Sequence, residues 1–138
     1  MEKRGGRGES SMESVRRYGE PPYETAVLHG GPGALGEVAP VARELGLERG
    51  VLEPMQQAPS VEGAILELEG LLETHARPPF TLVGFSWGAW LAWMFAARFP
   101  SRVRKLILVS SGPFEEPYAA AISEVRFGRL RPEDQSEA

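Results

Sequence analysis

The stretch Phe80-Thr81-Leu82-Val83-Gly84-Phe85-Ser86-Trp87-Gly88 decides the fold expected for this chain. Residues 80–83 are apolar or β-branched and predict a buried strand, and Trp87–Phe99 is apolar almost all round, as a buried helix would be. Gly84 and Gly88 lie two residues before and two residues after Ser86. A nucleophile that projects from a sharp strand-to-helix turn needs strained backbone angles and close backbone contacts, which glycines allow. The stretch therefore predicts Ser86 as such a nucleophile.

Predicted strands and helices alternate on both sides of this turn. Short apolar runs predict further strands at Thr25–Leu28, Val51–Leu52 and Lys105–Val109. The last run is continuous rather than alternating, as in a sheet that is covered on both faces. Helical spacing of apolar residues predicts helices over 35–45, over 61–75 with Ser60 as N-cap, and over 118–130. This order predicts an α/β protein with a parallel sheet of about four strands and flanking helices.

The chain is expected to have three parts. Residues 1–22 are interpreted as a disordered or irregular segment, because the first eleven are polar and glycine-rich. Residues 23–116 form the α/β core that carries the nucleophile, and residues 117–138 begin a helical segment. Met12 opens a more ordinary sequence, so either Met1 or Met12 is the true start, and a native N-terminal mass distinguishes the two.

A second motif, His29-Gly30-Gly31-Pro32-Gly33, follows the first predicted strand. Small residues there let a backbone N–H group face a site, as a second oxyanion donor must. A rival interpretation starts from Gly31, Gly33 and Gly36, which match the G-x-G-x-x-G pattern of dinucleotide-binding folds, with Glu53 near the position of a ribose-binding acid. That interpretation leaves residues 84–88 unexplained and places a proline between the first two glycines, and it is kept as an alternative.

With these two motifs in this order, the sequence resembles the α/β-hydrolase superfamily, specifically members with an HGGPG loop such as proline iminopeptidase-like hydrolases. The resemblance covers residues 25–114. It implies Ser86 as nucleophile and the backbone N–H groups of Gly31 and Trp87 as oxyanion donors. It also implies residues that shape the two motifs: His29, Gly30, Pro32, Gly33, Gly84 and Gly88. The activity it implies is that of a serine hydrolase acting on an ester, amide or peptide carbonyl, without a cofactor.

The sequence departs from this superfamily after Ser86. The expected order is serine, then an acid, then histidine, and no histidine follows Ser86 in the 138 residues. Glu115 and Glu116 are weak candidates for the acid. The chain is therefore expected to be truncated at the start of a helical cap and to hold an incomplete triad. Whether it is an enzyme stays open, and the alternative is a non-catalytic remnant or interaction module of the same fold.

Composition narrows the other function classes. The chain has no cysteine, which excludes disulfides, thiolate metal sites and a cysteine nucleophile. Its only histidines, His29 and His75, argue against a histidine-rich metal site, and no metal is expected. A net charge of −4 without a basic stripe argues against nucleic acid. Without a signal peptide or a bilayer-length apolar run, no membrane association and a cytoplasmic location are expected.

Several other residues are given structural roles. His75 is expected to pack or to cap the end of its helix. Trp87, Trp90 and Trp93 are expected in the core, although Trp87 follows the nucleophile and could border an acyl pocket. A solvated helix face is expected for the glutamates at 62, 67, 69 and 73. In a truncated fold the apolar strand Lys105–Val109 has an unpaired edge, which predicts a homo-oligomer or a complementing polypeptide.

Overall fold

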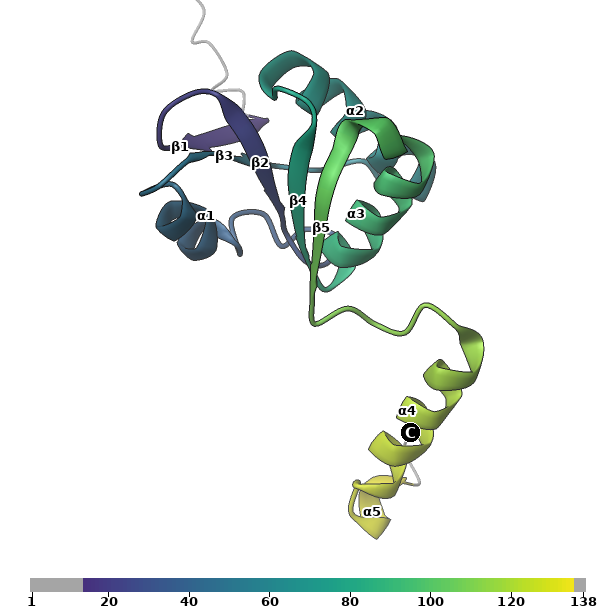
Figure 1. Cartoon of the computed structure of the whole chain (residues 1–138). Coiled ribbons are helices and arrows are strands. Elements are labelled where there is room, and N and C mark those ends of the chain that lie inside the picture. The colour runs from purple at the N-terminus through teal and green to yellow at the C-terminus, as the bar shows by residue number, and fades with distance from the viewer. Residues whose placement is uncertain (1–13, 136–138) are drawn as a thin grey trace, which may run out of the picture.

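The computed structural model describes residues 14–135, and the choice between Met1 and Met12 lies outside them. Five strands form one sheet in the order β1-β3-β2-β4-β5 (Figure 1). The strands are β1 (Val15–Tyr18), β2 (Tyr23–Leu28), β3 (Gly50–Pro54), β4 (Phe80–Phe85) and β5 (Val103–Val109). The helices are α1 (Ala39–Leu45), α2 (Val61–His75), α3 (Trp87–Arg98), α4 (Glu116–Gly128) and α5 (Pro132–Gln135), with a short 3-10 turn at Pro100–Arg102.

The four predicted strands pair in parallel, as expected, but the sheet is mixed because β1 is antiparallel to β3. β1 lies in the segment 1–22 that the sequence predicted to be disordered or irregular, so that prediction is wrong for residues 15–18. Val15 is 3% exposed and lies opposite Pro54 in the register. The buried Val15 side chain and the antiparallel backbone pairing with β3 hold this strand in the sheet.

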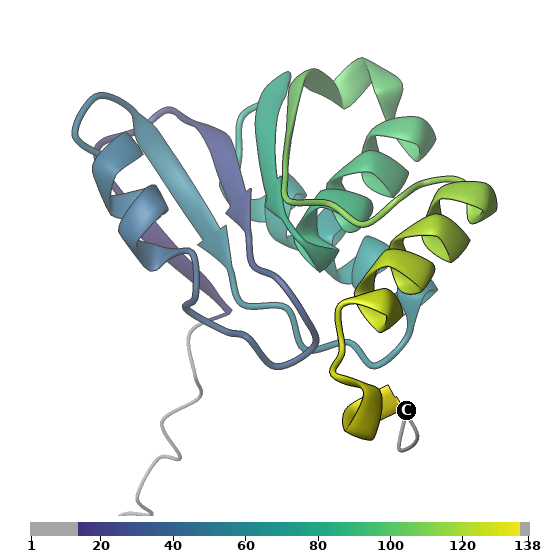
Figure 2. The ribbon, with the colours of Figure 1, turned by 90° about the horizontal axis from the view of Figure 1, so that it is seen from below.

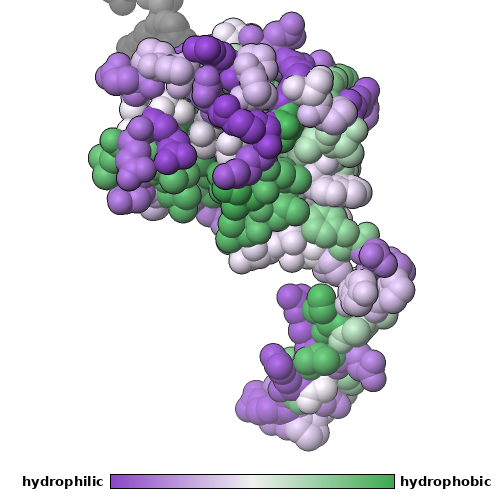
Figure 3. All heavy atoms as spheres, viewed as in Figure 1, coloured by the Kyte–Doolittle hydropathy of each residue, from purple (hydrophilic) through white to green (hydrophobic). Residues whose placement is uncertain are grey.

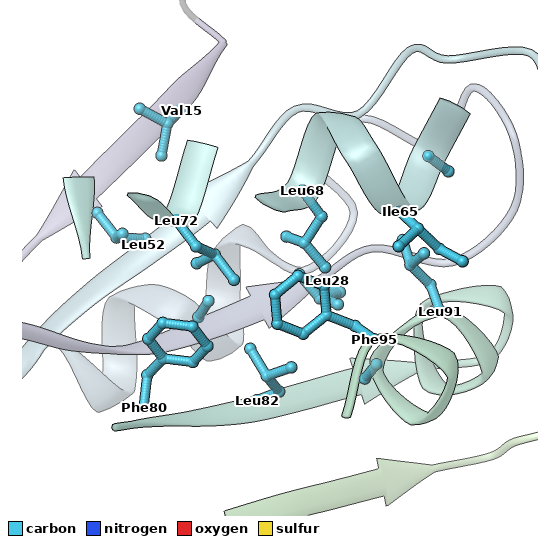
Figure 4. Packing of buried hydrophobic residues seen from close by; sticks show 13 residues of the cluster. Val15, Leu28, Leu52, Ile65, Leu68, Leu72, Phe80, Leu82, Leu91 and Phe95 are labelled. Carbon is cyan, nitrogen blue, oxygen red and sulfur yellow. The ribbon is translucent and has the colours of Figure 1, made fainter. Parts of the chain in front are cut away.

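Helices cover both faces of the sheet, α1 one face and the pair α2 and α3 the other (Figures 1 and 2). The larger core lies between the sheet and the α2–α3 layer (Figure 4). There Leu68 and Leu72 of α2 and Phe95 of α3 meet Phe80 and Leu82 of β4. The smaller core joins α1 to the opposite face through Val38, Ala42, Val27 and Val51. These two layers hold the carboxyl ends of β2 and β4 side by side.

The helix boundaries follow local chemistry. The Ser60 side chain accepts a hydrogen bond from the Gly63 N–H, 3.0 Å away, and caps α2 as predicted. α3 begins at Trp87 as predicted, and Pro100 follows its end. α1 begins only at Ala39, later than the predicted residue 35, because residues 31–37 form turns in which Gly31, Gly33 and Gly36 have positive φ.

The C-terminal part of the described chain differs from the rest. β5 was expected to be covered on both faces, yet Ile107, Leu108 and Val109 are 37–43% exposed. The helix α4 stands away from the sheet (Figure 1), and none of its residues is buried. Apolar surface is visible over the lower part of the sheet and along α4 in the same view (Figure 3). Within residues 14–135, no helix has both the length and the apolar character needed to span a bilayer.

Candidate active site

Ser86 occupies the turn between β4 and α3, where the sequence placed a nucleophile. Its backbone has φ 54° and ψ −116°, a conformation that non-glycine residues rarely adopt. The Ser86 N–H donates to the Val109 carbonyl at 2.9 Å, and the Ser86 carbonyl accepts from the Ala89 N–H at 3.0 Å. Both bonds fix the serine between the end of β5 and the first turn of α3. Strained residues held this firmly are typical of functional turns.

Gly84 and Gly88 are required by close backbone contacts, as the sequence predicted. A Cβ atom on Gly84 would overlap the Gly88 carbonyl oxygen, and one on Gly88 would overlap the Leu28 carbonyl oxygen. β4 therefore runs directly against the first turn of α3, and that turn runs directly against the end of β2. This packing brings Ser86 next to the glycine-rich loop that follows β2. A Cβ on Gly30 would lie 3.3 Å from the Ser86 Cβ.

His29 ties the glycine-rich loop to the strand beside it. The side chain is 3% exposed. Its Nε2 accepts a hydrogen bond from the Gln56 N–H at 3.2 Å, so Nδ1 carries the proton and donates to the Gly30 carbonyl at 2.7 Å. Both ring nitrogens are thus used inside the loop. This arrangement suits the predicted shaping role and leaves His29 without a free nitrogen to serve as a base.

The loop backbone turns its small residues toward an open hollow. Gly31 has φ 33°, and a Cβ there would meet no atom within 4 Å. Gly31, Pro32 and Trp87 line a hollow of about 230 Å³ together with the loop before α2. Gly33 has φ 87° and completes the turn. Gly31 and Trp87, the two residues predicted to donate backbone N–H groups, therefore border one space.

A second hollow, of about 240 Å³, opens at the serine itself. It is lined by Ser86, Trp87, Trp90 and Gly112. The Trp90 indole N–H donates to the Gly112 carbonyl at 3.2 Å and so joins α3 to the loop after β5. Ser86 thus lies beside two hollows, with Trp87 between them. A strand-to-helix turn with these neighbours has the form of a nucleophile elbow.

Comparison with known families identifies the fold. A family model described as "alpha/beta hydrolase fold" matches residues 63–136, which is more than half of the chain. The chain belongs to this family. A curated α/β-hydrolase relative, the cis-3-alkyl-4-alkyloxetan-2-one decarboxylase of Shewanella oneidensis, is 32% identical over 59 residues. The matched segment is 42% of this chain and 19% of that protein.

Solved structures share the α/β-hydrolase fold with the chain. The structure of VinJ matches with a TM-score of 0.72 and 23% identity, over 88% of this chain and 47% of that one. The thioesterase domain from the curacin biosynthetic pathway matches with a TM-score of 0.64 and 23% identity, over 81% and 46%. A marine microorganism esterase matches with a TM-score of 0.61 and 21% identity, over 87% and 52%. The chain spans about half the length of these α/β-hydrolase structures.

The weak acid candidates are not brought into the site by any contact. Glu115 is the N-cap residue of α4 and Glu116 is its first residue, and both side chains are exposed. Among residues 14–135, neither carboxylate takes part in a hydrogen bond or an ion pair. His75 is also engaged elsewhere, with Nδ1 2.8 Å from the Arg17 Nη2. The described part of this α/β-hydrolase fold therefore holds no acid–histidine pair beside Ser86.

The geometry of Glu53 and of the glycine loop argues against dinucleotide binding. Glu53 is fully buried, accepts a hydrogen bond from the Tyr18 hydroxyl at 2.9 Å and lies 3.6 Å from the Arg16 guanidinium. Its other carboxylate oxygen has no partner among the described residues. Burial, together with the hydrogen bond to Glu53, raises the pKa of Tyr18. A buried acid cannot reach a ribose, and no helix begins at Gly36 to receive a pyrophosphate.

Some side chains have roles that the sequence did not suggest. Glu67 was assigned to a solvated face, yet its carboxylate accepts hydrogen bonds from the backbone N–H groups of Gln57 and Ala58, both at 2.8 Å. It thereby fixes the loop that borders the hollow at Gly31.

Trp90 and Trp93 were predicted to lie in the core, but they are 37% and 47% exposed. Within residues 14–135, no three His, Cys, Asp or Glu side chains are grouped to hold a metal ion.

Proposed function

We propose that this chain is the nucleophile-bearing part of a serine hydrolase that acts on an ester, amide or peptide carbonyl. The observation that carries the proposal is the backbone of Ser86, with φ 54° and ψ −116° between β4 and α3. Strain of this kind costs on the order of 1–3 kcal/mol and persists only where the surrounding structure enforces it. This backbone conformation also requires glycine at positions 84 and 88, because Gly84 and Gly88 each lie against a backbone carbonyl.

The proposed reaction proceeds in two steps. The Ser86 Oγ attacks the carbonyl carbon while a base takes the Oγ proton, and the oxygen that becomes negative faces the N–H groups of Gly31 and Trp87. The bond to the leaving group breaks and the proton passes to that group. Water then attacks the acyl-serine, which releases the acid and restores Ser86. The open space at Gly31 supports its role, since a donor must be free of side chains to face the oxyanion.

The base is proposed to come from residues other than the 138 of this sequence, in the same or in another polypeptide. No histidine follows Ser86, and both nitrogens of His29 are bonded within its loop. Association through Lys105–Val109, by a second copy or a complementing polypeptide, is part of this proposal. The exposed side chains of Ile107 and Val109 support it. A monomer in light scattering at high concentration would contradict association.

Covalent labelling tests the nucleophile. The purified chain is treated with a fluorophosphonate, with and without free imidazole as a replacement base, and its intact mass is measured. We expect one adduct that is lost in Ser86→Ala and kept in Ser110→Ala, a matched change at another serine with positive φ. Equal labelling in Ser86→Ala would contradict the proposal.

The second candidate function is a non-catalytic interaction module of the same fold. Two observations favour it, namely the exposed, unpaired Glu115 and Glu116 carboxylates within the described part, and the engaged nitrogens of His29. A folded chain that stays unlabelled even with imidazole would support this candidate. The names of the structural neighbours include esterase, thioesterase and epoxide hydrolase. The fold alone therefore does not choose the substrate.

A further inference from the structure

An apolar hollow lies one to two helical turns along α3 from Ser86. It has a volume of about 230 Å³. Its walls are Trp90, Trp93 and Met94 of α3 and Pro113 and Phe114 of the loop after β5. The sequence did not predict that Trp90 and Trp93 are exposed, and their exposed side chains form part of these walls. We refer to these five residues as the aromatic hollow.

The walls of the aromatic hollow present apolar carbon atoms to a ligand and carry no charged group. The ring centroids of Trp93 and Phe114 are 5.2 Å apart, and those of Trp90 and Phe114 are 6.1 Å apart, so the three rings form one tilted cluster. None of the five side chains is ionisable. The one N–H of Trp90 is already bonded to the Gly112 carbonyl. An anion or a strongly hydrogen-bonding ligand would lose its water here without compensation, whereas an aliphatic chain or an aryl ring would gain.

The aromatic hollow adjoins the hollow at Ser86. Trp90 lines both of them, and Gly112, which lines the hollow at Ser86, precedes Pro113 directly. At 1.5 Å per residue, the seven residues from Ser86 to Trp93 span roughly 10 Å along α3. A group attached to the Ser86 Oγ therefore reaches the aromatic hollow if it carries a chain of medium length. The hollow at Gly31 differs, since Gln56 and Ser60 contribute polar groups to it.

We propose that the aromatic hollow binds the acyl chain of the substrate, and that the substrate class is a carbonyl compound with a medium-length aliphatic or aryl-alkyl acyl group. The proposal rests on the proposed function for the role of Ser86, but the binding of the chain itself does not. Trp90 then packs against the first methylenes, while Trp93 and Phe114 enclose the end of the chain. Acetyl groups are too short to reach these rings.

Fluorescence quenching tests the binding without any catalysis. 8-Bromooctanoate is titrated into the full chain, because its terminal bromine quenches an indole that it contacts. We expect saturable quenching, several times weaker with 2-bromoacetate at the same concentration. Each methylene that enters the aromatic hollow is expected to tighten binding roughly twofold to fourfold. The exposed Phe114 can be changed to alanine without opening the core, and Phe114→Ala is expected to weaken binding about fivefold.

Leu47→Ala is the matched control, because Leu47 is an exposed apolar residue that follows α1. It is expected to leave quenching unchanged. Equal affinity in wild type and Phe114→Ala, or no difference between the two bromoacids, would overturn the proposal. Absence of quenching would also overturn it.

A second readout separates this inference from the proposed function. Fluorophosphonates with ethyl and octyl chains are compared in labelling rate, with imidazole present. A preference for octyl that is lost in Phe114→Ala supports both proposals. Labelling without a chain-length preference leaves the nucleophile in place and overturns the aromatic hollow as the acyl site. Quenching that depends on Phe114 in a chain that never labels supports the aromatic hollow and counts against the hydrolase.

Discussion

The turn at Ser86 lies beside the segment from β5 to α4, but the two regions differ in how their residues are packed. Around the elbow, two strands and a helix touch through backbone atoms, and Gly84 and Gly88 are buried. In β5 and α4, by contrast, no residue is buried at all. The geometry of the Ser86 turn thus depends on packing among β2, β4 and α3, together with one backbone hydrogen bond to Val109 at the end of β5. The acid and the base that such chemistry needs are not supplied by the segment after it.

This difference separates the backbone conformation of Ser86 from the activation of its hydroxyl group. The strained serine is held by contacts among β2, β4 and α3 and by the backbone bond to the end of β5, because close packing transmits the constraint. Activation of that serine needs a proton acceptor, which is a separate requirement. Mutations at the elbow and in the C-terminal segment should therefore differ sharply in their effects on folding.

The largest effect is expected for Gly84→Ala. The added methyl group would overlap the Gly88 carbonyl, so β4 and α3 must move apart, and we expect a loss of more than about 3 kcal/mol in the free energy of unfolding. Urea denaturation followed by tryptophan fluorescence measures it. Gly70→Ala is the matched control, since Gly70 is exposed within α2 and its added Cβ would meet nothing within 4 Å. That control is expected to stabilise the chain by about 0.5–1 kcal/mol. Equal midpoints for the two variants would contradict the close packing at the elbow.

The same contacts explain why the elbow could be predicted from sequence. The spacing of Gly84 and Gly88 around Ser86, between a β-branched run and an apolar helix, is a local pattern with a steric cause. The parallel order of the four main strands followed from their apolar runs and connections in the same way. Roles that depend on the final chemistry, such as those of Gly31 and Trp87, stay predictions.

The features that could not be predicted depend on partners distant in the sequence. β1 has only one buried apolar residue, Val15, and is ordered by pairing with β3 some 35 residues later. The burial of Glu53 likewise depends on Tyr18 and Arg16 across that pairing. The exposure of Trp93 was missed because α3 is apolar almost all round, and such a helix gives no sign of which face stays open.

A smaller effect is expected from relieving the strain at Ser86. Glycine adopts positive φ without a steric penalty, so Ser86→Gly should be about 1 kcal/mol more stable than Ser86→Ala, which keeps the strain. Ser110 provides the comparison in the other region, because it has a similar φ of 50° in the exposed loop after β5. We expect a smaller difference between Ser110→Gly and Ser110→Ala, since no packed element holds that residue. Thermal unfolding of the four variants measures both differences. A difference at Ser110 as large as that at Ser86 would show that packing is not what enforces the strain.

The smallest effect is expected from removing the C-terminal segment. A chain that ends at Glu115 loses α4 and α5, whose side chains bury nothing in the core, so its free energy of unfolding should change by less than about 0.5 kcal/mol. An isolated helix of this length is marginal in water. Circular dichroism of the full chain should therefore show less helix than the structure contains, and the loss on truncation should be correspondingly small. A markedly lower urea midpoint for the shortened chain would mean that α4 packs against the body in solution. The aromatic hollow is the nearest apolar surface to the start of α4 along the chain, so stronger quenching in the shortened chain than in the full chain would then indicate that α4 covers it.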